Sequence, residues 1–238
     1  MDPTYVGDEL ELFRTARNWK AYLREVLGRY LNGNVAEIGA GIGATAEVLA
    51  DNPSVKSWLC VEPDPQQVAK IELLIAEGKL PKYVTALASS IKEIPSVPTF
   101  DSIIYVDVLE HIEHDRTEVE EAAKRLAPGG RLVVLGPAWQ FLFSEFDKSI
   151  GHYRRYTLSS LRQLMPAGVE ETDAFYLDGV GFLASLANKM FLKQGMPTLS
   201  QIQTWDSLMV PVSRITDNIT SRFIGRSVVI IWTKRKNG

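Results

Sequence analysis

Acidic and imidazole side chains are concentrated in the stretch VDVLEHIEHD, which comes directly after a run of apolar residues. Asp107, Glu110, His111 and His114 are spaced at i, i+3, i+4 and i+7, so a helix over this stretch would place them on one face. Because imidazole titrates near neutral pH, His111 is a candidate general base. Asp107, Glu110 and His111 are also a candidate divalent-cation site, since mixed carboxylate and imidazole donors suit several metals. In a third interpretation, Glu110 and His111 hydrogen-bond the local turn and Asp107 lies beside a bound ligand.

A second group of reactive side chains lies in the stretch FDKSIGHYRRYT. The group consists of His152, Tyr153, Arg154, Arg155 and Tyr156. Either arginine can bind an acidic acceptor through two parallel hydrogen bonds, and His152 can serve as a base. The segment therefore predicts substrate recognition. The alternative is a structural loop in which one arginine pairs with a local acid, one tyrosine packs, and Thr157 caps the next helix.

A glycine-rich loop lies within the stretch VAEIGAGIGAT. Its glycines, Gly39, Gly41 and Gly43, follow a short apolar run. Glycines after a strand allow a sharp turn and a close approach of ligand to backbone, and the helix N-terminus that follows favours negative charge. Gly39, Gly41 and Ala44 also satisfy the dinucleotide pattern G-x-G-x-x-G/A, with Glu62 at about the distance of a ribose-binding acid. The pattern indicates a nucleoside ligand and leaves its identity open.

Glu37, two residues before the first glycine, argues against a dinucleotide. A carboxylate there would repel a pyrophosphate, whereas it would stabilise a cationic amino-acid portion such as that of S-adenosylmethionine. A long helix expected before the first strand can also fold over the ligand. A nicotinamide-dependent oxidoreductase is further disfavoured because no Tyr-x-x-x-Lys pair stands where it could relay a proton.

Strand and helix patterns alternate along the chain and must position these groups. Apolar strand patterns cover residues 34–38, 56–62, 82–87, 100–107 and 130–136, and helical patterns cover 8–31, 44–51, 64–78 and 115–127. Buried strands joined by single helices predict a doubly wound α/β fold with a mainly parallel sheet. Further strands are expected at 169–177 and 227–233, and Asp64 is expected to cap the helix that follows it.

An apolar insert is expected between residues 179 and 223, with helices at 181–192 and 203–219. Such a helical pair can supply the walls of an acceptor pocket, a dimer contact or a lid that faces a membrane.

The composition narrows the class of protein. The 238 residues are 45% hydrophobic and 23% charged, which suits one sizeable core. A net charge of −3, from 26 basic and 29 acidic residues, argues against nucleic acid as a partner. Cys60 is the only cysteine, which excludes an intramolecular disulfide and a cysteine-rich zinc site. The sequence has no secretory signal pattern, and no apolar run reaches the roughly 20 residues of a membrane-spanning helix. We therefore expect a cytoplasmic monomer or homodimer without stable membrane insertion.

Several motifs together resemble the class I S-adenosylmethionine-dependent methyltransferases. EIGAGIG resembles their first motif, VEPD their ribose-binding acid and LAPGGRLVV the turn into their fifth strand, over roughly residues 18–134. DVLEHI resembles the ubiquinone-pathway O-methyltransferases, and GHYRRYT resembles a signature of a bacterial small-molecule subgroup. SVVIIWT resembles the family's antiparallel seventh strand. The resemblance implies a Rossmann-like seven-stranded sheet, mostly parallel with an antiparallel last strand, a helical cap, and S-adenosylmethionine as cofactor with S-adenosylhomocysteine as product.

The resemblance also implies roles for individual residues. The residues implied to contact the cofactor are Trp19, Glu37, Gly39, Ala40, Gly41, Gly43, Glu62, Pro63, Asp64, Ser89, Ser90 and Asp107. Glu62 would chelate the ribose hydroxyls, and Ser89 and Ser90 stand where many relatives have an acid that contacts the adenine. Trp19 lies on the helix that covers the cofactor in a related subgroup, although it can equally be a core residue.

The expected organisation is one methyltransferase domain over residues 1–238. It comprises a covering helix at 1–33, a cofactor-binding core at 34–136, an acceptor region at 137–225 with the insert at 179–223, and a closing strand and tail at 226–238. Transfer to a small-molecule acceptor is expected, with oxygen ahead of nitrogen and a carbohydrate or lipid-linked intermediate as a variant. The alternative of another class is a non-catalytic nucleoside-binding scaffold. The feature that discriminates between them is whether His111 and His152 face one cavity.

Overall fold

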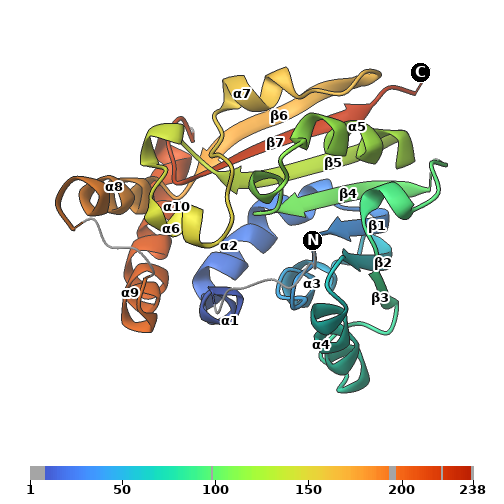
Figure 1. Ribbon diagram of the computed structural model, residues 1–238, viewed down its shortest axis with the longest axis horizontal. Helices are drawn as coiled ribbons and strands as arrows, with labels where there is room; N and C mark the ends of the chain where they lie inside the picture. Colours follow the sequence, from blue (N-terminus) through green and yellow to red (C-terminus); the bar gives the residue numbers. More distant parts are fainter. Residues whose placement is uncertain (1–8, 98, 193–196, 221, 237–238) are drawn as a thin grey trace.

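A single mixed sheet forms the centre of the molecule in the computed structural model, which describes residues 9–97, 99–192, 197–220 and 222–236 (Figure 1). Within these residues seven strands are hydrogen-bonded in the order β3-β2-β1-β4-β5-β7-β6. They are β1 Gly33–Ile38, β2 Val55–Glu62, β3 Val84–Ala88, β4 Phe100–Val106, β5 Leu126–Pro137, β6 Val169–Leu177 and β7 Ser227–Lys234. Only β7 runs antiparallel, between β5 and β6. The predicted mostly parallel sheet with an antiparallel last strand is confirmed. Parts of the expected first helix, insert and tail, at 1–8, 193–196, 221 and 237–238, lie outside the described residues.

Helices cover both faces of the sheet. Adjacent residues of β4, Ile103 and Ile104, belong to two different hydrophobic clusters because successive side chains of a strand point to opposite faces. One cluster includes side chains of α2 Arg17–Leu27, α3 Ala46–Leu49 and α4 Pro65–Ala76. The other includes side chains of α5 Asp115–Arg125 and α7 Leu158–Gln163. The central strands β4 and β7 are almost continuous apolar runs because both of their faces are buried, whereas the outer strands β3 and β6 carry exposed residues.

The first helical region is broken, which corrects the expectation of one helix over 8–31. It is divided into α1 Glu9–Arg14, α2 Arg17–Leu27 and the 3-10 turn η1 Gly28–Tyr30. Before the break, the Thr15 hydroxyl donates to the Leu12 carbonyl over 2.7 Å. After it, the Asp206 carboxylate accepts hydrogen bonds from the backbone N–H of Asn18 and Trp19, at 3.1 and 2.8 Å. A distant acid thus satisfies the first amides of α2 and stabilises a new helix start.

The N-terminal caps predicted from the sequence are found at two helices. Asp64 accepts a hydrogen bond from Gln66 N over 2.8 Å at the start of α4, and Thr157 accepts one from Ser160 N at the start of α7. The remaining short elements between the strands are η2 Ile91–Glu93, η3 Leu109–His111, η4 Gln140–Leu142 and α6 Glu145–Ser149.

Helices of the expected insert gather at one end of the molecule (Figure 1). They are α8 Gly179–Ala187, the π-helical η5 Asn188–Leu192, α9 Leu199–Thr204, the π-helical η6 Trp205–Met209 and α10 Val210–Ile219. We call α8 to α10 the cap. None of the described helices has the length and apolar character needed to cross a bilayer.

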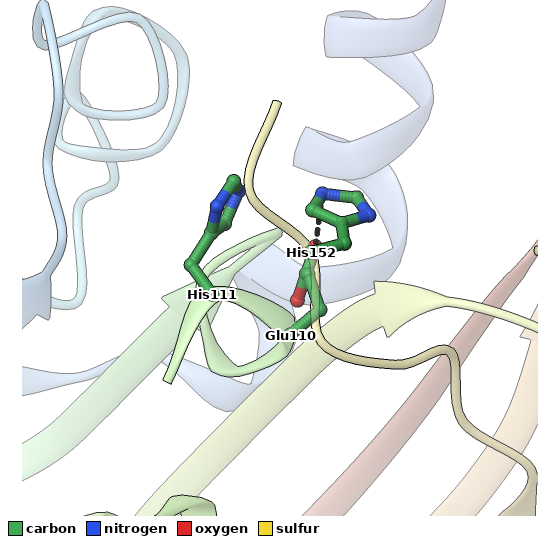
Figure 2. Close-up of side chains that lie close together, drawn as sticks. All are labelled: Glu110, His111 and His152. Atoms are coloured by element: carbon green, nitrogen blue, oxygen red, sulfur yellow. Dashed lines mark ion pairs between the residues drawn. The ribbon is translucent and has the colours of Figure 1, made fainter. Parts of the chain in front are cut away.

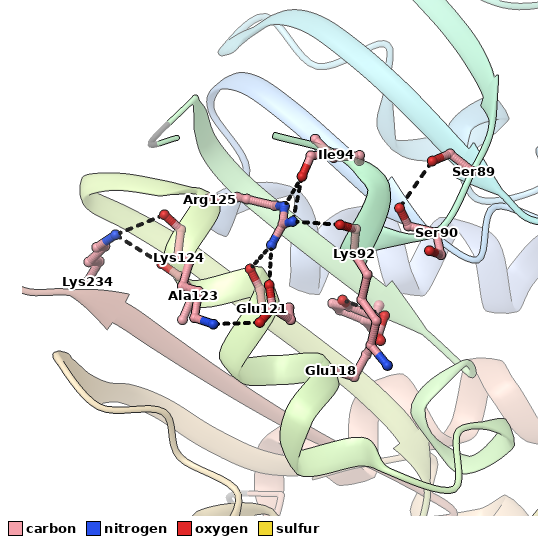
Figure 3. Close-up of polar contacts among 11 residues, drawn as sticks. Ser89, Ser90, Lys92, Ile94, Glu118, Glu121, Ala123, Lys124, Arg125 and Lys234 are labelled. Carbon is pink, nitrogen blue, oxygen red and sulfur yellow. Dashed lines mark hydrogen bonds and ion pairs between the residues drawn. The ribbon is translucent and has the colours of Figure 1, made fainter. Parts of the chain in front are cut away.

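A buried arginine attaches the end of α5 to the segment between η2 and β4 (Figure 3). Arg125 donates to the Ile94 carbonyl over 2.9 Å and to Glu121 over 2.8 Å, and Lys234 of β7 donates to the carbonyls of Ala123 and Leu126. These contacts satisfy both the buried guanidinium and carbonyls at the end of α5, so this polar cluster has a structural explanation.

Candidate functional site

A cavity of about 240 Å³ opens at the carboxyl ends of β1, β4 and β5. Its walls come from the glycine loop, from α1 and α2, from the turn after β4, from residues 146–155 and from the cap. The carboxyl edge of a parallel sheet is where ligands bind in open α/β folds, because the strand order changes direction there. The cavity is therefore the candidate site.

The glycine loop forms the floor beside β1. Gly39, Ala40 and Gly41 line the cavity, and Gly39 and Gly41 have φ angles of +68° and +54°. A Cβ on Gly39 would lie 2.6 Å from a methyl carbon of Val108, so a side chain cannot be accommodated there. Gly43, with φ +79°, lies outside the cavity wall and donates its N–H to the Ala40 carbonyl over 2.9 Å, which closes the loop.

Glu37 lies behind this loop and does not line the cavity. Its side chain is 2% exposed, and one carboxylate oxygen accepts a hydrogen bond from Trp58 Nε1 over 2.9 Å. Burial raises the pKa of Glu37 to about 7, against the hydrogen bond from Trp58, which lowers it. The Glu37 carboxylate therefore points toward Trp58 on β2 and away from the cavity.

Glu62, at the end of β2, is tied directly to the glycine loop. Its carboxylate accepts hydrogen bonds from Gly41 N over 2.8 Å and from Asp64 N over 3.0 Å. Burial raises the pKa of Glu62, while these two backbone donors lower it. Pro63 is exposed and Asp64 caps α4. None of Glu62, Pro63 and Asp64 belongs to the cavity wall, although Glu62 contacts a residue that does.

Ser89 and Ser90 also lie outside the cavity wall, after β3 (Figure 3). Ser90 N donates to the Glu93 carboxylate over 2.8 Å, and the Ser89 hydroxyl donates to the same oxygen over 3.1 Å. The two serines thereby cap η2, which is the local role that Ser favours.

The two histidines are brought together in the cavity wall (Figure 2). The ring centroids of His111, on η3, and His152, on the loop after α6, are 4.5 Å apart in an edge-to-face arrangement. Burial, together with the neighbouring His152, lowers the pKa of His111 to about 4, so this ring is neutral at pH 7. Asp107 lines the same cavity, and desolvation raises the pKa of its carboxyl to about 6 against the charges of Arg226 and His152.

The turn after β4 does not form the expected helix. Only η3 is helical, because Asp107 has φ +53° and the Glu110 carbonyl accepts a hydrogen bond from Tyr153 N over 2.8 Å. This bond to a distant segment replaces the bond that would continue the helix. His114 is consequently exposed at the start of α5 and outside the cavity wall.

Asp147 is a buried partner of His152 that no sequence pattern singled out. Its carboxylate accepts hydrogen bonds from His152 Nδ1 over 3.0 Å, from Arg155 Nε over 2.8 Å and from Ser144 N over 2.8 Å. Burial opposes ionisation, but the hydrogen bonds from His152 and Arg155 outweigh it and hold the pKa of Asp147 below its usual range. The spacing of Asp147 five residues before His152, within one loop, is the signal that could have indicated it.

Glu110 is fully buried beside the histidines. Neither of its carboxylate oxygens has a hydrogen-bond partner within the part of the chain that the structure describes, and Oε1 lies 3.8 Å from His152 Nε2. Burial and the charge of Asp107 raise the pKa of Glu110 well above its ordinary value. Glu110, His111 and His152 can each bring one ligand atom within 4.8 Å of the others. His152 therefore takes the place of Asp107 in the candidate metal set.

Only one of the four expected acceptor-binding residues in the GHYRRYT segment lines the cavity. Arg155 does so while paired with Asp147. Arg154 instead pairs with Asp115 at 2.7 Å, and the Tyr156 hydroxyl donates to the same carboxylate over 2.9 Å. Tyr153 is 53% exposed. Arg154 and Tyr156 therefore turn toward Asp115 and away from the cavity wall, and acceptor contacts by Tyr153, Arg154 and Tyr156 stay a prediction.

Residues of α1, α2, the cap and the strand ends complete the cavity wall. Trp19 lines it, and its ring centroid lies 5.6 Å from that of Trp205; a contact of Trp19 with the cofactor stays a prediction. Phe13, Asp178 and Arg226 also line it, although no motif pointed to them. They come from three segments far apart in the chain, so no local spacing connects them.

Comparison with known families identifies one matching domain. Residues 36–132 match the family described as "Methyltransferase domain". The chain is also similar to the ubiquinone biosynthesis O-methyltransferase of Aliivibrio fischeri (strain MJ11), with 25% identity over 156 residues. That match covers 65% of this chain and 62% of the relative, so the chain spans about three-fifths of the length of the curated relatives it matches.

Solved structures share the fold over nearly the whole chain. The N-methyltransferase NodS from Bradyrhizobium japonicum WM9, in complex with S-adenosylhomocysteine, has a TM-score of 0.56 at 18% identity, covering 98% of this chain and 92% of that one. Coclaurine N-methyltransferase, bound to N-methylheliamine and S-adenosylhomocysteine, has a TM-score of 0.62 at 13% identity, covering 92% and 70%. At sequence identities this low, the comparison establishes a shared fold and nothing about the acceptor.

Proposed function

We propose that the chain is a class I S-adenosylmethionine-dependent methyltransferase that transfers a methyl group from that cofactor to a small-molecule acceptor, in line with the methyltransferase domain matched over residues 36–132. The observation that carries the proposal is that His111 and His152 line the same cavity as Gly39, Ala40 and Gly41. A non-catalytic nucleoside-binding scaffold would have no need of imidazoles beside its ligand. Oxygen is the favoured acceptor atom over nitrogen, because a hydroxyl requires a base and a free amine does not.

The cofactor is proposed to lie over the glycine loop, because the backbone of Gly39, Ala40 and Gly41 lines the cavity. Each Glu62 carboxylate oxygen accepts one backbone hydrogen bond, which leaves acceptor capacity on both for the ribose hydroxyls. Asp107, at the end of the neighbouring strand β4, is mostly ionised at pH 7 and places a negative charge on the sulfonium side. Trp19 would cover the ligand from α2.

His152 is the proposed general base. Asp147 accepts from its Nδ1, which leaves Nε2 as the basic nitrogen. In the proposed step the acceptor hydroxyl gives its proton to Nε2, its oxygen forms a bond to the methyl carbon, and the carbon–sulfur bond breaks to leave S-adenosylhomocysteine. The positive charge that forms on His152 is stabilised by ionised Asp147. His111, neutral at pH 7, would form the adjacent wall and limit the entry of water.

A lipid-linked acceptor is a second candidate, because apolar side chains are exposed on the cap and after it. Leu208, Ile215, Ile219 and Phe223 are 65%, 65%, 76% and 80% exposed. A surface of this kind can hold the apolar tail of an acceptor whose reactive end enters the cavity.

The proposal is tested by binding and then by turnover. Calorimetric titration with S-adenosylmethionine, S-adenosylhomocysteine and NADH should give binding of the first two alone; binding of NADH alone would overturn the assignment. A panel of phenols, catechols and amines is then screened for formation of S-adenosylhomocysteine. His152→Ala should abolish transfer to a hydroxyl without weakening cofactor binding. His114→Ala, at an exposed position outside the cavity wall, is the matched control and should retain activity.

A further inference from the structure

Arg226 lines the cavity at the end formed by β7. It directly precedes β7, whose first residue, Ser227, pairs with Pro137 of β5 and Leu177 of β6. Three strand spacings separate β1 from β7 in the sheet order, and neighbouring strands lie about 4.8 Å apart, so Arg226 begins roughly 14 Å from the strand that carries the glycine loop. This distance places Arg226 beyond the methionine portion of a cofactor bound at that loop.

Two aromatic rings lie beside the Arg226 guanidinium. Its central carbon lies 4.8 Å from the centre of the Trp205 ring and 5.8 Å from that of Phe13. Aromatic contact occupies the flat faces of a guanidinium and leaves the N–H groups at its edge available. Within the described ranges, no group accepts a hydrogen bond from the Arg226 side chain, and no carboxylate oxygen lies within 4.0 Å of its nitrogens.

The other permanent cations in the cavity wall are already paired. Arg14 and Lys20 lie 2.7 and 3.9 Å from Glu47, and Arg155 lies 2.8 Å from Asp147. Among the described residues of the wall, Arg226 is the cation without such a partner.

Asp178 lies near Arg226, but its carboxylate is committed elsewhere. It accepts hydrogen bonds from Trp205 Nε1 over 2.7 Å, from Ser213 Oγ over 2.6 Å and from Gly181 N over 2.9 Å. Burial lowers the pKa of Arg226, and the charge of Arg155 lowers it further. The charges of Asp178, Asp107 and Asp147 raise this pKa and only partly offset the effect, since none of these carboxylates forms an ion pair with Arg226. A partly desolvated guanidinium without a direct anionic partner favours the binding of an anion.

We propose that Arg226 binds an acidic group of the acceptor, a carboxylate or a phosphate, and so selects acidic acceptors. This inference rests on the proposed function, since the acceptor is the molecule that would be methylated. The guanidinium edge would donate two parallel hydrogen bonds to the acidic group. The rings of Trp205 and Phe13 would contact the acceptor's apolar body, and its nucleophile would point toward His152. The cofactor's own carboxylate has the same chemistry, so the experiment must distinguish the two sources.

The test uses the full chain saturated with S-adenosylhomocysteine, with benzoate and phenyl phosphate as acidic probes and benzamide as the neutral control. Binding is followed calorimetrically for the wild type, Arg226→Gln and Arg226→Lys. Arg222→Gln is the matched control, because Arg222 also covers an aromatic ring, Phe175, at 5.1 Å but does not line the cavity. Arg226→Lys keeps the charge and remains informative if the glutamine variant does not fold.

At least one acidic probe should bind the wild type, and Arg226→Gln should weaken it about ten- to a hundredfold, the range for hydrogen bonds to charged groups. Arg226→Lys should lose less, because it retains a point charge without the bidentate edge. Arg222→Gln should bind the acidic probes as tightly as the wild type does. The affinity for S-adenosylhomocysteine should be the same in all of these variants.

Three results would overturn the inference. They are unchanged probe binding in Arg226→Gln, no binding of either acidic probe to the wild type, and a loss of S-adenosylhomocysteine affinity in Arg226→Gln with unchanged affinity for 5′-methylthioadenosine. The last would assign the guanidinium to the cofactor's carboxylate. If S-adenosylhomocysteine itself does not bind the wild type, the proposed function fails, whereas the acidic probes still test Arg226 on the ligand-free protein.

Discussion

Glu37→Gln should make the protein more stable at high pH relative to the wild type. Glu37 is 2% exposed, and burial raises its pKa from 4.5 to about 7. Glutamine keeps an oxygen that can accept the hydrogen bond from Trp58 Nε1 and removes the ionisable group. The variant therefore isolates the free energy of placing a charge behind the glycine loop.

The direction in which the contribution of Glu37 to stability changes with pH follows from proton binding. Between pH 4.5 and about 7 the folded protein holds the Glu37 proton while the unfolded chain releases it. The contribution of Glu37 to stability is therefore complete below pH 4.5 and is lost as the pH rises through about 7. The two pKa values predict a loss of about 2.5 kcal/mol between pH 5.0 and pH 8.5. We expect the free energy of unfolding of the variant, minus that of the wild type, to increase by that amount.

Urea unfolding at pH 5.0, 7.0 and 8.5 measures the difference directly. Glu120→Gln, an exposed position on α5, is the matched control and should show a small difference that does not change with pH. The reasoning is refuted if the difference between Glu37→Gln and the wild type is the same at all three pH values.

Three further perturbations test the site. Glu62→Ala should weaken S-adenosylhomocysteine binding by about 1–3 kcal/mol, because the ribose hydroxyls lose their acceptor; equal affinity in a calorimetric titration would contradict that role. Asp147→Asn should lower the free energy of unfolding by about 3 kcal/mol, because it leaves the buried Arg155 cation without its charged partner. The same variant should reduce turnover more than cofactor affinity, because His152 loses its orientation. Urea unfolding and a methyl-transfer assay measure the two effects, and unchanged turnover would exclude Asp147 as a positioning residue. Treatment with a chelator should leave activity unchanged if Glu110, His111 and His152 act without a metal; loss on chelation and recovery with added divalent cation would favour the metal interpretation.

Sequence patterns predicted the sheet and its helices because these depend on short-range regularities. The runs 34–38, 100–107 and 130–136 are apolar at successive positions, which is typical of parallel strands buried on both faces. Asp64 and Thr157 were predicted as caps because a cap needs only a hydrogen bond to a residue two or three positions on. The glycine loop was recognisable for the same reason, since its positive φ angles restrict the residue type locally.

The helical reading of the turn after β4 was wrong because the periodicity of Asp107, Glu110 and His111 was the only signal, and a contact from another segment overrode it. The Glu110 carbonyl bonds to Tyr153 N instead of continuing a helix. In the same way, Asp206 stabilises the start of α2 by accepting a hydrogen bond from Asn18 N, 188 positions away in the sequence.

Residue types and local spacing therefore supplied the fold class, the glycine loop and the candidate histidines. Tertiary packing decided which side chains share the cavity: it brings His152, paired with Asp147, to His111, directs Arg154 away while Arg155 enters, and places Arg226 in the cavity wall. The physical reason is that a side chain's direction within one element follows from backbone geometry, whereas a contact between elements depends on how both pack against the sheet. That packing is a property of the whole core, and no short stretch of the chain contains it.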